Sequence, residues 1–119
     1  MSKRIFMILE SYINGNWITG DNTNTRSMYD AITGEVIGLT STEGLDIGGA
    51  LQYGRDHGHI LRKMTFQQRG NMIKKLALYL NKRKEHFYDI SYKTGATRVD
   101  SWIDIEGGFG NLFANASLR

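Results

Sequence analysis

The 119-residue sequence predicts an N-terminal β-hairpin region over residues 1–40, followed by a helical region of about four α-helices over residues 41–119. Three observations support this order. An Asn-Gly pair divides two short apolar runs near the N-terminus, apolar residues recur at helical spacing after residue 41, and two capping boxes mark helix starts in the second half. The length suits one domain.

Two turns organise the strand region. Asn14-Gly15 lies between Tyr12-Ile13 and Trp17-Ile18, and an Asn-Gly pair supplies the two positive φ angles of a type I′ hairpin turn. A second turn is bracketed by Asp30 and Gly34 and leads into the strand-like residues 36–39. We therefore expect two short antiparallel pairs of strands.

The first helix is expected to run from a cap at Ser41 or Thr42 to about His57, with Gly58 as its stop. Its narrow apolar face recurs at i, i+3, i+4 and i+7. The residues of this face are Ile47, Ala50, Leu51 and Gly54.

The next helix begins at a capping box, with Thr65 as the cap and Gln68 three residues later. Its apolar stripe comprises Met72, Ile73, Leu76, Ala77 and Leu80. A further short helix is expected to carry Phe87 and Ile90 and to end at Gly95.

The last helix begins at a second capping box, Thr97 to Asp100. Its apolar face comprises Trp102, Ile105, Phe109, Leu112 and Ala116. This helix also contains Gly107, Gly108 and Gly110, three glycines in four residues. A phosphate-binding loop would place them before a helix, whereas the cap lies about ten residues upstream, so the pattern favours the helix interior.

Glycines inside a helix are costly. Each one destabilises a helix by roughly 0.8–1.0 kcal/mol relative to alanine, so three cost on the order of 2–3 kcal/mol. This cost indicates that another helix or strand, from this chain or from outside it, packs closely against the backbone there.

Other candidate sites each have a simpler structural explanation. Asp100, Asp104 and Glu106 could bind a hard cation or form an acid/base pair, but Asp100 belongs to the capping box and a helix N-terminus favours acidic residues. His57 and His59 are two residues apart and His86 is distant. This is not the i, i+4 spacing of two metal ligands on one helix face, so we expect surface or loop histidines.

The composition argues against several classes of function. The net charge of +3 and a pI near 9.3 are mildly basic, and the basic residues between 69 and 84 fit a solvated helix face better than a nucleic-acid surface. There is no cysteine, which excludes thiol chemistry within this chain. The N-terminal apolar run, Ile5–Leu9, is too short for a signal peptide or a membrane span. We expect a cytoplasmic protein.

Four stretches follow one another in the order seen at the start of aldehyde dehydrogenases: SYINGNWITG, DAITGEVIG, MTFQQRGNMIKKLALYLNKRKEHFYDIS and TGATRVDSWIDIEGGFGNLFANAS. They match the family's Gly-x-Trp hairpin at Gly15–Trp17, its TGEV-like turn at Thr33–Val36 and its TGK-like turn at Thr94-Gly95. The chain therefore resembles the N-terminal segment of the aldehyde dehydrogenase superfamily. The last stretch further resembles the bifunctional, ring-opening branch of bacterial phenylacetate degradation.

The resemblance implies an α/β parent enzyme, a homo-oligomer that oxidises a CoA-linked semialdehyde with NADP or NAD. The family's cysteine nucleophile and catalytic glutamate lie downstream of the matched residues. We therefore assign no catalytic, cofactor-binding or metal-binding residue in this chain, and expect it alone to be inactive and to bind no cofactor.

The segment that ends at Arg119 continues in the family. Residues 1–119 are therefore expected to form an incomplete N-terminal part of the dinucleotide-binding domain. The expected partners are the remainder of the dehydrogenase domain or other copies of the chain, and neither nucleic acid nor a membrane. An alternative from another class stays open, namely an autonomous small helical interaction module derived from such an enzyme.

Overall fold

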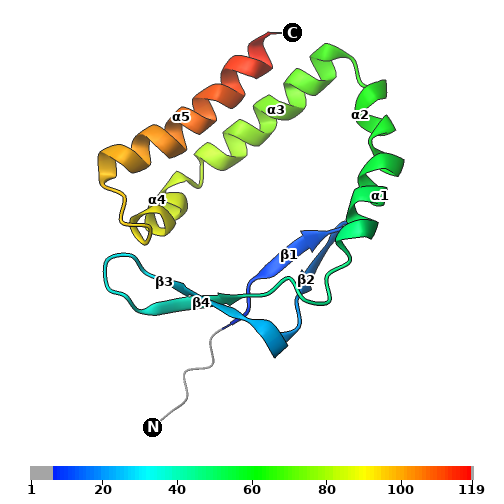
Figure 1. The fold of residues 1–119 in the computed structure, drawn as a ribbon. Coiled ribbons are helices and arrows are strands. Elements are labelled where there is room, and N and C mark those ends of the chain that lie inside the picture. Colours follow the sequence, from blue (N-terminus) through cyan, green and yellow to red (C-terminus); the bar gives the residue numbers. More distant parts are fainter. Residues whose placement is uncertain (1–6, 119) are drawn as a thin grey trace. The chain divides into compact units, whose positions relative to one another are not determined.

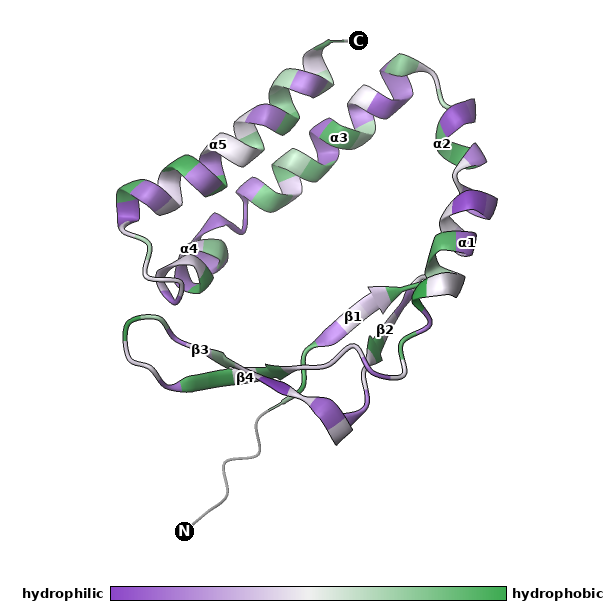
Figure 2. Ribbon diagram, in the orientation of Figure 1, coloured by the Kyte–Doolittle hydropathy of each residue, from purple (hydrophilic) through white to green (hydrophobic). Residues whose placement is uncertain are grey.

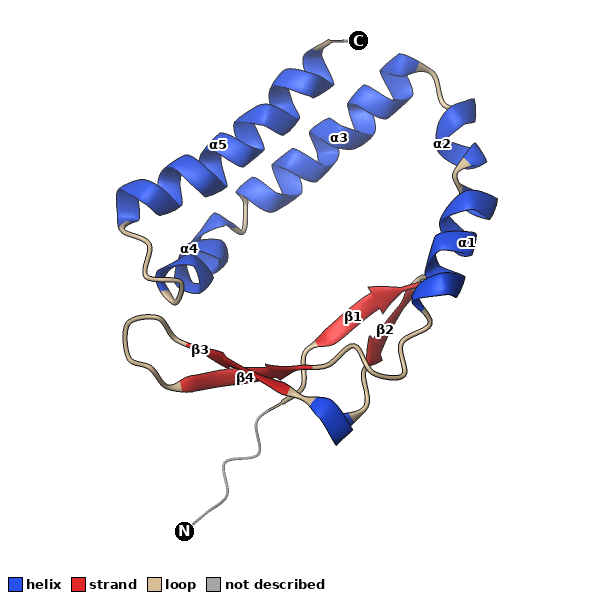
Figure 3. Cartoon of the chain, viewed as in Figure 1, coloured by secondary structure: helices blue, strands red, loops and turns tan. Residues whose placement is uncertain are grey.

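The computed structural model describes residues 7–118. Ile5 and Phe6 of the N-terminal apolar run, and the terminal Arg119, lie outside the described residues. The chain divides into two compact units, Met1–Gly58 and His59–Arg119. The strands belong to the first unit, and the second unit is built from helices (Figures 1 and 3).

The first unit opens with the predicted hairpin. Strands β1 (Glu10–Ile13) and β2 (Asn16–Thr19) pair antiparallel, with Tyr12 opposite Trp17. The turn residues Asn14 and Gly15 have φ angles of 53° and 83°, which are the positive angles that a type I′ turn requires. The Asn-Gly prediction is confirmed.

The second strand pair is also confirmed. Strand β3 (Arg26–Tyr29) follows the short 3-10 helix η1 (Asn22–Asn24) and pairs antiparallel with β4 (Val36–Thr40). The carboxylate of Asp30 organises the turn between them, because it accepts hydrogen bonds from two backbone N–H groups at 2.8 and 3.1 Å. Gly34 closes the turn with a φ of +71°, a left-handed angle that glycine adopts without steric cost.

Helix α1 spans Ile47–His57, and the predicted cap at Ser41 or Thr42 is wrong. The true cap is Asp46, whose side chain accepts a hydrogen bond from the Gly49 N–H at 2.8 Å. Ser41 instead accepts from the N–H two residues later, at 3.3 Å, within a turn. Gly44 has a φ of +75°, so an α-helix that starts at Ser41 or Thr42 cannot continue through this residue.

The second unit contains α2 (His59–Lys63), α3 (Phe66–Asn81), α4 (Lys84–Tyr92) and α5 (Arg98–Ser117). The short helix α2, directly after Gly58, is absent from the sequence prediction. Both predicted capping boxes are confirmed, at Thr65 and at Thr97. Helix α4 ends at Tyr92, and Gly95 lies just beyond it with a φ of 85°.

Helices α3 and α5 run side by side (Figure 1). Their buried residues are small: Gly70 and Ala77 on α3, Ser101 and Ala116 on α5. Small residues allow the helix axes to approach closely. Figure 2 shows hydrophobic and hydrophilic residues interleaved along both helices.

The predicted apolar stripes are only partly covered. Within the stripe of α3, Ala77 is buried, whereas Met72 and Leu76 remain 43% and 48% exposed. On α5, Ala116 is buried but Trp102 is 55% exposed. Among the described residues, the buried hydrophobic ones are Ile13, Ala77, Tyr88 and Ala116. This is a small core for a chain of this length.

Candidate functional site

A polar cluster joins α4 to α5. Oε1 of Glu106 accepts a hydrogen bond from the Tyr88 hydroxyl at 2.9 Å and one from Lys84 Nζ at 3.1 Å. The lysine contact is also an ion pair. Tyr88 is only 2% exposed, so this link lies against the core of the helical unit.

Contacts within the cluster shift the pKa values of its members. The hydrogen bond from Tyr88, followed by that from Lys84, lowers the pKa of Glu106. Burial, followed by the hydrogen bond to Glu106, raises the pKa of Tyr88. An ionised carboxylate with a lowered pKa is a weak base, and a general base at neutral pH works best with a pKa near 7. The arrangement therefore suits a link between helices better than proton transfer.

Arg98, the first residue of α5, completes the cluster. Its guanidinium lies 4.9 Å from the centre of the Tyr88 ring and donates to the Tyr92 hydroxyl at 3.2 Å. The hydrogen bond to Tyr92 is the main reason why the pKa of Arg98 is raised. A shallow pocket of about 280 Å³ lies beside these groups, and its lining residues are Tyr88, Arg98, Val99, Trp102 and Glu106.

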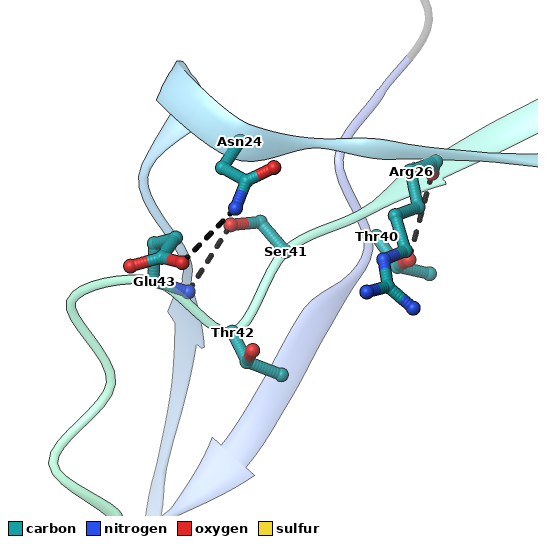
Figure 4. Close-up of a pocket in the computed structure, with 6 residues that line it drawn as sticks. All are labelled: Asn24, Arg26, Thr40, Ser41, Thr42 and Glu43. Carbon is teal, nitrogen blue, oxygen red and sulfur yellow. Dashed lines mark hydrogen bonds between the residues drawn. The ribbon is translucent and has the colours of Figure 1, made fainter.

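A second pocket, of about 320 Å³, lies in the strand unit. Figure 4 shows its lining residues, which are Asn24, Arg26, Thr40, Ser41, Thr42 and Glu43. Several of these groups bond to one another: Asn24 Nδ2 donates to Glu43 Oε1 at 3.2 Å, and the Thr40 hydroxyl donates to the Arg26 carbonyl at 3.5 Å. The first bond ties the loop after β4 to η1, and the second lies within the β3–β4 strand pair.

The three glycines lie in the interior of α5, as predicted. The phosphate-loop alternative is not supported, because Gly107 comes nine residues after the first residue of the helix, Arg98. A Cβ added at Gly107, Gly108 or Gly110 would meet no described atom within 4 Å beyond the helix's own nearby backbone. The described residues of the helical unit therefore contain no close packing partner for these glycines.

A known dehydrogenase is similar to this chain over most of the chain's length. No protein-family model matches the chain. Over 103 residues, which are 85% of this chain, it is 31% identical to a protein of Aromatoleum evansii named 3,4-dehydroadipyl-CoA semialdehyde dehydrogenase. The chain is a relative of the aldehyde dehydrogenases. The similarity confirms the resemblance found in the sequence, and it spans 20% of the length of the Aromatoleum protein.

The carboxylates of this aldehyde dehydrogenase relative do not form a joint site. Asp100 accepts hydrogen bonds from the Thr97 hydroxyl and backbone N–H, which lower its pKa in that order. Asp104 is exposed. Glu106 alone of the three reaches the neighbouring helix α4. Across residues 7–118, no group of three or more His, Asp or Glu side chains could hold a metal ion.

The histidines and basic residues make local contacts. The His57 ring stacks on Tyr53, with centroids 3.9 Å apart, and its Nδ1 lies 2.9 Å from the Tyr53 carbonyl oxygen. The Arg69 guanidinium lies 4.7 Å from the centre of the Phe66 ring, and Arg83 lies 3.7 Å from that of Tyr79. No helix within the described residues is both long and apolar enough to cross a lipid bilayer.

Sequence reasoning overlooked Lys84, Tyr88 and Arg98, which surround Glu106. Lys84 and Tyr88 are i, i+4 and so share one face of α4. This spacing indicates that Lys84 and Tyr88 can both donate hydrogen bonds to one acceptor on a neighbouring helix. The acceptor lies 18 and 22 residues away, and nothing in the sequence pattern indicates which residue of α5 it is.

Proposed function

We propose that the chain forms the N-terminal, non-catalytic part of an NAD(P)-dependent aldehyde dehydrogenase that oxidises a CoA-linked semialdehyde in phenylacetate degradation. The similarity over 85% of this chain to one fifth of a semialdehyde dehydrogenase carries the proposal. Under this proposal, residues 1–119 are an incomplete part of the dinucleotide-binding domain. The parent is a cytoplasmic homo-oligomer, and this segment contacts the remainder of the dehydrogenase or other copies of the chain.

The uncovered surface supports a scaffolding role. Within the strand unit Trp17 is 67% exposed, and within the helical unit Trp102 is 55% exposed. Large apolar side chains make up part of this surface, and a larger enzyme would bury them.

A domain replacement tests the proposal. The matched segment of the Aromatoleum dehydrogenase is exchanged for this chain, and NAD(P)H formation is followed at 340 nm with a CoA-linked semialdehyde. We expect the chimaera to fold and to reduce the cofactor, and the isolated 119-residue chain to give no signal above a protein-free control. Turnover by the isolated chain, or a chimaera that does not fold, would contradict the proposal.

A further inference from the structure

We propose that strand β3 is a self-association surface, on which β3 of a second copy of the chain pairs antiparallel. Within the described residues, β3 forms a ladder with β4 along one edge and pairs with no strand along the other (Figure 3). We call this second side the open edge of β3. The inference goes beyond the proposed function, because it rests on the strand unit alone and involves no enzyme activity.

Ser27 directs its backbone groups to the open edge. It faces Leu39 in the ladder, and Leu39 uses its own backbone groups on the other side of β4. The Leu39 N–H donates to the Met7 carbonyl at 3.2 Å, and the Leu39 carbonyl accepts from the Leu9 N–H at 2.8 Å. Residues that face each other in an antiparallel ladder either bond to each other or both point away. The N–H and C=O of Ser27 therefore point away from β4.

Tyr29 has the same orientation. The next residue, Asp30, is bonded on the β4 side, because its N–H donates to the Glu35 carbonyl at 2.8 Å, and neighbours along a strand alternate in direction. The register shift near Tyr29 adds its extra residue, Ile37, to β4, so the alternation within β3 continues. Outside the ladder with β4, no described residue bonds to the backbone of Ser27 or Tyr29.

The sequence of β3 fits a second copy of itself. When Ser27 exchanges backbone bonds with Tyr29 of the second copy, and the reverse, Met28 lies opposite its own copy. The same register places Arg26 opposite Asp30 of the second copy, and two-fold symmetry forms this pair twice. Opposite charges that face each other across two strands are stabilising. Within the part of the chain that the structure describes, the Arg26 guanidinium forms no other ion pair.

The charges select this partner and this register. A shift of the second copy by two residues in either direction keeps backbone bonding possible but separates Arg26 from Asp30. A charged residue on an edge strand discourages pairing with an unrelated strand, whereas the second copy supplies the matching carboxylate. The described residues of the helical unit form helices and their connections, so none of them supplies a strand for this edge.

Single cysteines test the register, because the chain contains no cysteine of its own. Met28→Cys places two sulfurs across a pair whose Cα atoms lie about 4.5 Å apart, a separation that a disulfide spans. Ser27→Cys and Tyr29→Cys are the matched controls, because each lies diagonal to its own copy, with Cβ atoms about 7–8 Å apart. Under diamide oxidation of the 119-residue chain, we expect Met28→Cys to form the linked dimer about tenfold faster than either control.

Sedimentation equilibrium tests the charge pairs. We expect the 119-residue chain to dimerise with increasing concentration. Arg26→Glu should raise the dissociation constant about tenfold, because two repulsive pairs replace two attractive ones. Arg55→Glu, at an exposed position of α1, makes the same change in net charge and should leave the dissociation constant unchanged. Far-ultraviolet circular dichroism verifies that each variant is folded.

Three results would overturn the self-association surface: a wild-type chain that is monomeric at every concentration, a linked dimer that forms no faster from Met28→Cys than from the controls, or equal weakening by Arg26→Glu and Arg55→Glu. These assays need no enzyme activity. A domain-replacement chimaera that does not fold therefore overturns the proposed function alone, and a monomeric chain overturns the β3 pairing alone.

Discussion

Replacing all three glycines of α5 by alanine should stabilise the 119-residue chain. Gly107, Gly108 and Gly110 lie inside a continuous helix, and an added Cβ meets nothing within 4 Å at any of them. Each exchange therefore contributes its helix-propensity difference of about 0.8–1.0 kcal/mol without a steric cost. The free energy of unfolding of the helical unit should rise by about 2.4–3.0 kcal/mol for the triple variant.

Urea denaturation followed by circular dichroism at 222 nm measures this gain. For a small protein the slope of the unfolding free energy is about 1–3 kcal/mol per molar urea. The midpoint should therefore rise by about 1–3 M, with the slope unchanged. Gly95→Ala is the control within the same helical unit, because its φ is 85°. We expect the unfolding free energy of that control to fall by about 1–2 kcal/mol. A lower midpoint for the triple variant would refute the reasoning, since it would mean that α5 is packed or shaped differently.

Three further results are expected. Removing either capping hydroxyl, by Thr65→Ala or Thr97→Ala, should lower the unfolding free energy by about 1 kcal/mol in urea; a valine at either position should cost as much, because it also lacks the hydroxyl. Ala77→Leu should cost about 1–3 kcal/mol in the same assay, because Ala77 is fully buried between α3 and α5, and an unchanged midpoint would contradict that contact. The pKa of Glu106 is lowered, so its contribution to the unfolding free energy should be lost as the pH falls below about 4. The pKa of Tyr88 is raised, so its contribution should be lost as the pH rises above about 10. Urea midpoints across this range check the effect, and Glu106→Gln should flatten the acid side; an acid limb as steep as that of the wild type would exclude Glu106 as its source.

The local elements follow from the sequence because their causes are local. The turn at Asn14-Gly15 depends on two residues that adopt positive φ angles. The starts of α3 and α5 depend on a threonine and a side chain three residues later, at Thr65 and Thr97. The failure at α1 has the same kind of cause: Ser41 and Asp46 can both cap, and the left-handed backbone at Gly44 decides between them. Glycine permits that angle, but the helical spacing of apolar residues does not reveal it.

The sequence by itself determined the hairpin, two of the helix starts, the helical setting of the glycines and the relation to aldehyde dehydrogenases, since each rests on neighbouring residues or on a string of matched ones. Only the tertiary structure decided that Glu106 joins Tyr88 and Lys84, because helix packing sets which residues far apart in the chain meet. It also decided that Trp102 remains more than half exposed within the helical unit. An apolar stripe predicts that a helix face will be buried, but the elements present in three dimensions determine what can bury it.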